Sequence, residues 1–349
     1  MNNNAQFSLK LIWEAGEGHK YALQRIPGMI VTEKGTLIIY NEARFERNDW
    51  APMEIYAQRS TDHGDTFGDP IYLAHGDDQH KTVNNPVMVQ DKNGRIHFLY
   101  CEDYGIRGGR IVRRYSDDDG ITWSAPIDIT PFTVPEYRNV FAIGPGHGVC
   151  TKDGTLVFPV WMVPKKFGCT EVMHWPSVIS TVYSRDNGES WQIGEILPTT
   201  ADIINPNETS ICLLSDGRVY LNVRHMVQHR AMAISENGYS NWVNYVPDKR
   251  LIDPVCFGSV AHYNDGVNPY TVVFANCEHK SARKNVVVKA SVSDTVNWEY
   301  RKVIDSERGG YVEVTADSAN GWIYVLYENK AGETVHLARF NHAWLTSKD

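Results

Sequence analysis

The 349-residue chain contains no apolar run that approaches the length of a membrane-spanning helix. Residues 1–6 also lack the charged and then apolar pattern of a secretory signal. We therefore expect no membrane partner. We expect a cytoplasmic protein, or a secreted one whose leader peptide does not form part of this sequence.

Paired metal-binding or redox motifs are also missing. The six cysteines show no C-x-x-C spacing, so neither a zinc site nor a disulfide framework is expected. We expect free buried thiols at Cys101, Cys150, Cys169, Cys212, Cys256 and Cys277. His225 and His229 stand four residues apart, but they lack the glutamate of H-E-x-x-H. We expect neither a metal nor a cofactor.

Charge of one sign does not gather in any segment. The net charge is −8, whereas nucleic-acid binders usually carry a basic stripe, so we expect no nucleic-acid partner. Long helix-period patterns and Pro/Gly/Ser-rich linkers are absent too. The 42% hydrophobic content, rich in tyrosine and tryptophan, suits an all-β core. These features favour a single domain over residues 1–349.

The sequence does contain an eight-residue motif that recurs. It reads S-x-D-x-G-x-T-aromatic at residues 60–67. Clear copies follow at 116–123 and 184–191, and degenerate copies follow at 235–242 and 291–298. The first serines of successive copies lie 56, 68, 51 and 56 residues apart. Such a period indicates one supersecondary unit repeated several times. The motif is the Asp-box repeat, which identifies a fold and leaves the chemistry open.

Each clear copy follows an alternating apolar stretch that predicts a half-buried strand, at residues 55–59, 111–115 and 179–183. The acidic residue and the glycine suit a tight turn, because a carboxylate accepts backbone N–H bonds and glycine tolerates positive φ. We expect the closing aromatic to pack against the sheet. Two further strands between boxes make a four-stranded blade. The sequence thus predicts an all-β, six-bladed β-propeller. Its first and last blades would carry no clear box, and strands from both chain ends would close the ring.

Between the boxes, seven further segments occur in the order in which the exo-sialidase (neuraminidase) family of bacteria and animals has them. They are Arg25-Ile26-Pro27; residues 41–44 with Asp49; 144–148; Asn207-Glu208 with 214–224; 253–259; 282–285; and Gly310-Tyr311 with 326–328. The chain therefore resembles this family over roughly residues 20 to 345.

The resemblance implies a site for sialic acid, whose anomeric carbon carries a carboxylate. Arg25, Arg224 and Arg283 would grip that carboxylate, since guanidinium binds it bidentately and stays charged. Glu328 would hold Arg25 through an ion pair, and Arg44 would contact the ring substituents of the sugar. Trp161 would form the floor of a pocket for the N-acyl group. The alternative is that Trp161 only packs in the hydrophobic core.

The resemblance also assigns the catalytic groups. Tyr311 would be the nucleophile, because a neutral phenol avoids the repulsion that a carboxylate would meet beside the substrate carboxylate. Its ordinary pKa lies near 10, so Glu208 would act as its base. Asp49, on a predicted loop, would be the general acid and then the general base, with Glu46 and Glu54 as rival acids.

The sequence therefore predicts a retaining exo-α-sialidase that acts on sialylated oligosaccharides or glycoconjugates. One alternative is a sialoglycan-binding propeller that has lost catalysis, although Asp49, Glu208 and Tyr311 are all present. A closer alternative is an enzyme of the same fold that transfers the glycosyl group intramolecularly or acts on a related nonulosonic acid. Linkage preference, N-acyl preference and oligomeric state stay open.

Overall fold

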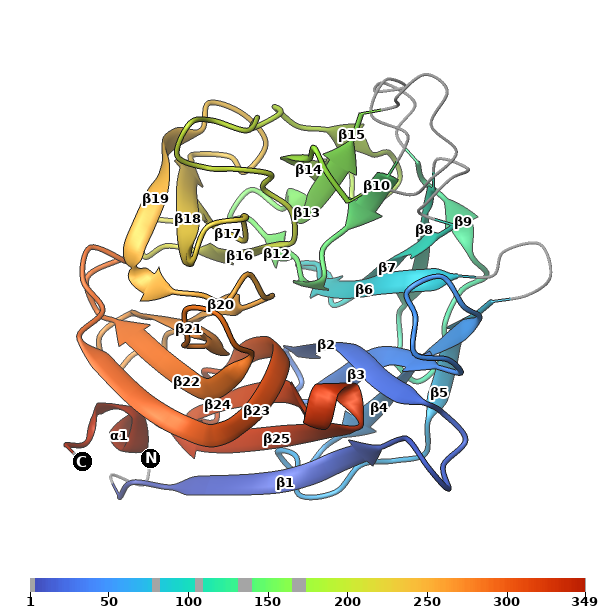
Figure 1. The fold of residues 1–349 in the computed structure, drawn as a ribbon, viewed down its shortest axis with the longest axis horizontal. Helices are drawn as coiled ribbons and strands as arrows, with labels where there is room; N and C mark the ends of the chain where they lie inside the picture. Colours follow the sequence, from blue (N-terminus) through green and yellow to red (C-terminus); the bar gives the residue numbers. More distant parts are fainter. Residues whose placement is uncertain (1–3, 77–81, 104–108, 131–139, 165–173, 349) are drawn as a thin grey trace.

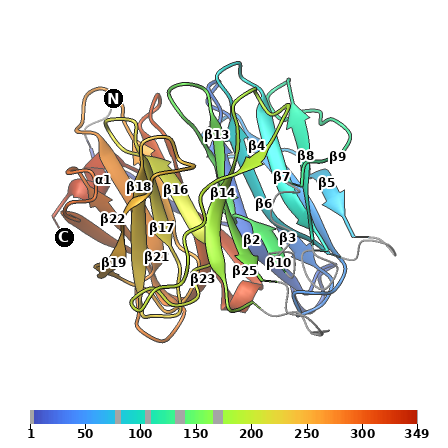
Figure 2. The ribbon, with the colours of Figure 1, turned by 90° about the horizontal axis from the view of Figure 1, so that it is seen from above.

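The computed structural model describes residues 4–76, 82–103, 109–130, 140–164 and 174–348. Its strands form five hydrogen-bonded sheets that follow one another in chain order around a common centre (Figure 1). Seen from above, the sheets stand side by side (Figure 2). This arrangement is a β-propeller, and it confirms the all-β expectation. No described helix is long and apolar enough to cross a membrane.

The first four sheets use residues 23–252 and build up one after another. The first contains β2 (Leu23–Val31), β3 (Leu37–Arg44), β4 (Met53–Ser60) and β5 (Ile71–His75). The second contains β6 (Val83–Gln90), β7 (Ile96–Glu102), β8 (Arg110–Ser116) and β9 (Ile127–Asp128), with β11 (Gly146–His147) added in parallel to β6. The third contains β10 (Val140–Ile143), β12 (Val149–Cys150), β13 (Leu156–Val163), β14 (Val178–Ser184) and β15 (Gln192–Ile193). The fourth contains β16 (Thr209–Leu213), β17 (Val219–Val223), β18 (His229–Ser235) and β19 (Val243–Ile252).

The fifth sheet has seven strands and joins the two ends of the chain. It contains β20 (Ser259–Tyr263), β21 (Thr271–Cys277), β22 (Lys284–Ser291), β23 (Tyr300–Asp317), β24 (Trp322–Asn329), β25 (Thr334–Asn341) and β1 (Phe7–Glu14). The first half of the 18-residue β23 pairs with β22, and its second half pairs with β24. N-terminal β1 pairs antiparallel with β25, which confirms closure by both chain ends. The 3-10 turn η2 (Lys330–Gly332) and the short α1 (His342–Thr346) complete the described elements.

Every clear Asp box makes the same local bonds. In the first box the Gly64 N–H donates to Ser60 Oγ at 2.8 Å, and the Thr66 N–H donates to Asp62 Oδ1 at 2.9 Å. Both bonds recur in the second and third boxes. Gly64 has a φ of 88°, as the turn requires. The closing aromatics pack against the hydrophobic clusters, as expected.

Each box links the third strand of a four-stranded unit to its fourth strand, and this position corrects one prediction. The first sheet carries a clear box between β4 and β5, so the expectation that the first blade lacks one is wrong. The last four-stranded unit has no box. Its third strand is β25, and the partner of β25 is β1, which lies at the other end of the chain. No hairpin can join these two strands.

The strands that precede the boxes were predicted correctly, but they are more buried than alternation implied. In β4 the neighbouring Ile55, Tyr56 and Ala57 are all buried. The central strands β3 and β13 are buried at every position. Each sheet lies between two others, so both of its faces are covered and the alternation of polar and apolar residues is weakened. Four of the five described cysteines are buried, and all five are free thiols; Cys169 lies outside the described residues.

Candidate active site

A cavity of about 270 Å³ brings together almost all of the predicted site residues. Arg25 comes from β2, Arg44 from the end of β3, Trp161 from β13, Tyr311 from β23 and Glu328 from β24. Asp49, Glu208, Arg224 and Arg283 lie outside the strands. Eight of the nine residues line this cavity: Arg25, Arg44, Asp49, Trp161, Glu208, Arg224, Arg283 and Tyr311. Glu328 lies behind them. The ring of sheets thus gathers at one place residues that lie far apart in the sequence.

The hydroxyl group of Tyr311 lies against the carboxylate of Glu208. Tyr311 Oη is 2.6 Å from Glu208 Oε1 and 2.8 Å from Oε2. Burial raises the pKa of Tyr311 above its usual value near 10, and the Glu208 carboxylate raises it further. The phenol is therefore protonated and donates to a carboxylate placed to take its proton.

Three guanidinium groups surround the ring of Tyr311. The Cζ atoms of Arg25, Arg283 and Arg224 lie 5.1, 5.6 and 5.9 Å from the ring centroid. Arg224 Nη1 also donates to Tyr311 Oη at 3.0 Å and bonds Glu208. Arg283 makes no ion pair within the described residues. Such a concentration of positive charge favours an anionic ligand.

Glu328 anchors two members of the site at once. Its buried carboxylate accepts from Arg25 Nε at 2.8 Å and from the Ile26 N–H at 2.9 Å through Oε1. Its Oε2 accepts from the Tyr311 N–H at 3.1 Å. A Cβ on Gly310 would lie 2.2 Å from Oε2, so glycine is needed at that position. The predicted pairing of Glu328 with Arg25 is thus present, and the carboxylate also holds the backbone of Tyr311.

Arg44 lies between two carboxylates. It is buried, and its Nε and Nη2 donate to Glu42 Oε2 at 2.9 and 2.6 Å, while its Nη1 bonds Asp49. Glu42 is itself held by the Asn85 N–H at 2.7 Å. Arg44 therefore orients Asp49 in addition to lining the cavity.

Asp49 lies on the loop between β3 and β4, as predicted, and its side chain is 44% exposed. Its partial burial raises its pKa, but the positive charges of Arg44 and Arg25 outweigh that effect and lower the pKa overall. The rival acids Glu46 and Glu54 do not line the cavity. Glu54 bonds Lys20 at 2.9 Å and Tyr21 instead. The geometry favours Asp49 among the three.

Aromatic side chains form one wall of the cavity. Trp161, His174 and Trp175 line it, and the ring of His174 meets Trp161 edge-on at 5.8 Å, with Trp175 beside it. Trp50, which is not a lining residue, stacks on the ring of His174 at 5.7 Å. Trp161 also belongs to the hydrophobic core, so the binding and packing interpretations both apply to it.

Sequence reasoning missed several lining residues. His174 and Trp175 lie in the 68-residue interval between the second and third boxes, and residues 165–173 of that interval lie outside the described residues. Nothing in the sequence singled out Asn85 or Met226, which also line the cavity, whereas Val255, another lining residue, lies in the segment 253–259 named above.

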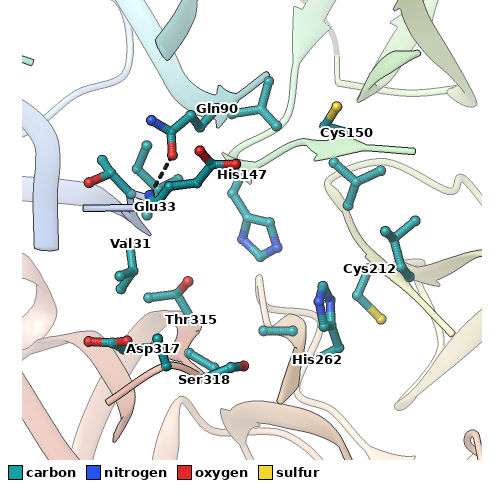
Figure 3. Close-up of a pocket in the computed structure, with 18 of the residues that line it drawn as sticks. Val31, Glu33, Gln90, His147, Cys150, Cys212, His262, Thr315, Asp317 and Ser318 are labelled. Atoms are coloured by element: carbon teal, nitrogen blue, oxygen red, sulfur yellow. Dashed lines mark hydrogen bonds between the residues drawn. The ribbon is translucent and has the colours of Figure 1, made fainter. Parts of the chain in front are cut away.

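A larger cavity of about 440 Å³ is lined by residues near the opposite ends of the same inner strands (Figure 3). His147 and His262 line it, together with Cys150 and Cys212. His147 bonds Glu313, two residues along β23 from Tyr311. This cavity contains no arginine. Among the described residues no group of three His, Cys, Asp or Glu side chains is placed to bind a metal.

Comparison with known proteins identifies relatives of the repeats and of the fold. A family model described as a BNR repeat-like domain matches residues 68–325. A sialidase of Bacteroides fragilis is 25% identical over 93% of this chain and 63% of its own length. A sialidase of Micromonospora viridifaciens is 27% identical over 92% of this chain and 52% of its own length. The chain thus spans about half to two thirds of these two relatives.

Solved sialidase structures superpose on the fold of this chain. The Hadza microbial sialidase Hz136 superposes with a TM-score of 0.80 at 25% identity, over 91% of this chain and 66% of that one. The intramolecular trans-sialidase of Ruminococcus gnavus superposes with a TM-score of 0.81 over 97% of this chain and 98% of that one. At 18% identity this second likeness concerns the fold alone. The chain belongs to the family of sialidases that carry BNR (Asp-box) repeats.

Proposed function

We propose that this protein is a retaining exo-α-sialidase that hydrolyses terminal sialic acid from sialoglycans through a tyrosine-linked intermediate. The observation that carries the proposal is the contact between Tyr311 Oη and Glu208 inside a cluster of three arginines. A carboxylate on the reacting carbon explains both the cations and the choice of a phenol as nucleophile. We also propose to count the seven-stranded sheet as two four-stranded blades that share β23, which gives six blades.

In the first step the substrate carboxylate is bound by Arg25, Arg224 and Arg283. Tyr311 Oη attacks the anomeric carbon while Glu208 takes the phenolic proton. Asp49 donates a proton to the glycosidic oxygen, so that the leaving sugar departs as an alcohol.

In the second step Asp49, now a carboxylate, takes a proton from water, which attacks the anomeric carbon. The bond to Tyr311 breaks, and the phenolate recovers its proton from Glu208. Two inversions at one carbon retain the anomeric configuration.

Asp49 must be protonated for the first step, although its pKa is lowered in the unliganded site. A bound substrate would offset the positive charge of Arg25 with its carboxylate and would cover the exposed part of the Asp49 side chain. Both effects raise the pKa of Asp49 when the site is occupied. Substrate binding itself therefore favours the acid form.

The aromatic wall of Trp161, His174 and Trp175 supports a second candidate, intramolecular transfer. A wall of this kind limits the access of water to the anomeric carbon. A hydroxyl group of the bound sugar would then attack in place of water and give an anhydro sugar. A protein that only binds sialoglycans is less favoured, because the contact between the nucleophile and its base is intact.

NMR of the products formed from 3′-sialyllactose tests these functions together. Release of free sialic acid first as the α-anomer supports the retaining hydrolase. An anhydro sugar as the main product supports intramolecular transfer, and a β-anomer formed first contradicts both. The variant Tyr311→Phe serves as the control for background hydrolysis.

A further inference from the structure

Beside the site lies a cavity of about 430 Å³ that the proposed reaction does not use. It shares Arg25 and Arg283 with the site cavity. Its other walls come from the start of β22, from the middle of β23 and from the turn between β24 and β25. The two cavities therefore meet along two arginines that are placed to grip the substrate carboxylate.

This second cavity is strongly basic. Its lining includes four cations, Arg25, Arg283, Lys284 and Arg308, against the single acid Glu328. Both oxygens of Glu328 are already engaged by Arg25 and by backbone N–H groups. No lining group remains to balance the other three cations.

Two of these cations face each other across a strand pair. Lys284 of β22 lies directly opposite Arg308 of β23 in the ladder, and both side chains are exposed. Like charges in that position destabilise a sheet. Within the described residues neither forms an ion pair with an acid. An anion bound between them would remove the repulsion.

We propose that this cavity binds a negatively charged group on the leaving part of the substrate. The enzyme would then prefer sialosides that carry a second anion, such as the carboxylate of an inner sialic acid or a sulfate ester on the leaving sugar. The inference rests on the proposed function. The leaving sugar is bonded to the same carbon as the gripped carboxylate, and Arg283, which belongs to both cavities, lies next to Lys284. Arginine and lysine both suit carboxylate and sulfate oxygens.

The test compares kcat/KM for α2,8-disialyllactose, a sulfated sialyllactose and neutral 3′-sialyllactose. The double variant Lys284→Gln/Arg308→Gln should lower the ratio of anionic to neutral kcat/KM roughly tenfold, since each exposed ion pair contributes about two- to fivefold. A loss for the disialyl substrate alone assigns the cavity to a carboxylate, and a loss for both assigns it to anions in general. High salt should reduce the wild-type preference.

The matched control is Arg185→Gln/Lys249→Gln, which removes two exposed cations outside the cavity and should keep the wild-type ratio. Equal ratios in the two double variants would overturn the proposal. Calorimetry with the same ligands in a Tyr311→Phe background measures the anionic preference without turnover. If no substrate is cleaved, the proposed function fails, and the binding ratio still decides whether the cavity selects anions.

Discussion

Tyr311 and Glu208 lie 103 positions apart in the sequence, yet both carboxylate oxygens of Glu208 are within 2.8 Å of the Tyr311 hydroxyl. This hydrogen bond is the geometry that the proposed transfer of the phenolic proton requires. The same burial that raises the pKa of Tyr311 keeps the phenol neutral until substrate arrives. In the proposed mechanism the three arginines beside the ring would favour the phenolate as the leaving group of the second step.

Replacing Tyr311 with phenylalanine should abolish turnover and leave binding of a dehydrated sialic acid analogue largely intact. The variant loses the nucleophilic oxygen but keeps the ring against which Arg25, Arg224 and Arg283 lie. Steady-state kinetics and calorimetry measure the two effects separately. Lost binding in a well-folded variant would contradict this separation of roles.

Asp49→Ala should slow hydrolysis of natural sialosides far more than that of an aryl sialoside with an acidic phenol. An acid is needed only for a poor leaving group, and positioned proton transfer contributes about 10²–10⁴-fold. The ratio of kcat/KM for the two substrates is the measurement. Glu54→Ala is the matched control and should change both rates mildly and equally, because Glu54 bonds Lys20 and Tyr21 outside the cavity. A selective loss at Glu54 in place of Asp49 would move the acid role from the loop to the start of β4.

Gly310→Ala should reduce kcat at least tenfold without unfolding the protein. The new Cβ would meet Glu328 Oε2 at 2.2 Å, and Glu328 cannot move aside without releasing Arg25 and the backbone of Tyr311. Thermal unfolding and kcat are measured together. Gly68→Ala is the control, since its nearest neighbour would be the Arg59 carbonyl at 3.8 Å. Wild-type kcat in Gly310→Ala would show that Glu328 does not need its present position.

The His147–Glu313 pair should make the free energy of unfolding fall as pH rises above about 6.5. Burial raises the pKa of Glu313 in spite of His147. Burial alone would lower the pKa of His147, but the Glu313 carboxylate more than offsets this and raises it. The native state therefore holds more protons than the unfolded chain. The stability that His147 contributes is complete below its unfolded pKa and is lost as pH rises through the raised folded value.

Urea unfolding between about pH 5.5 and 8.5 measures this slope, which is at most about 1.4 kcal/mol per pH unit for one proton. Glu313→Gln should flatten the slope relative to wild type, whatever its effect on stability at a single pH. Identical slopes would mean that the pair binds no extra proton on folding.

The Asp boxes could be predicted from the sequence because their bonds are local. In the first box Gly64 bonds Ser60 and Thr66 bonds Asp62, each across four residues, so the sequence alone determines that turn and its periodic recurrence. The ordered motifs between the boxes likewise pointed to Tyr311, Glu208 and the arginines. The alternation before each box predicted the strands correctly, but it could not reveal that neighbouring sheets cover both faces of the central ones.

Only the tertiary structure decided which of these residues meet. Arg25 and Glu328 are 303 positions apart and come together because β1 closes the ring against β25. His147 and Glu313, 166 positions apart, meet near the opposite ends of the inner strands. The basic cavity depends on the ladder register that sets Lys284 opposite Arg308. Contacts of this kind depend on the packing of whole sheets around an axis, so the spacing of residues along the chain carries no signal for them.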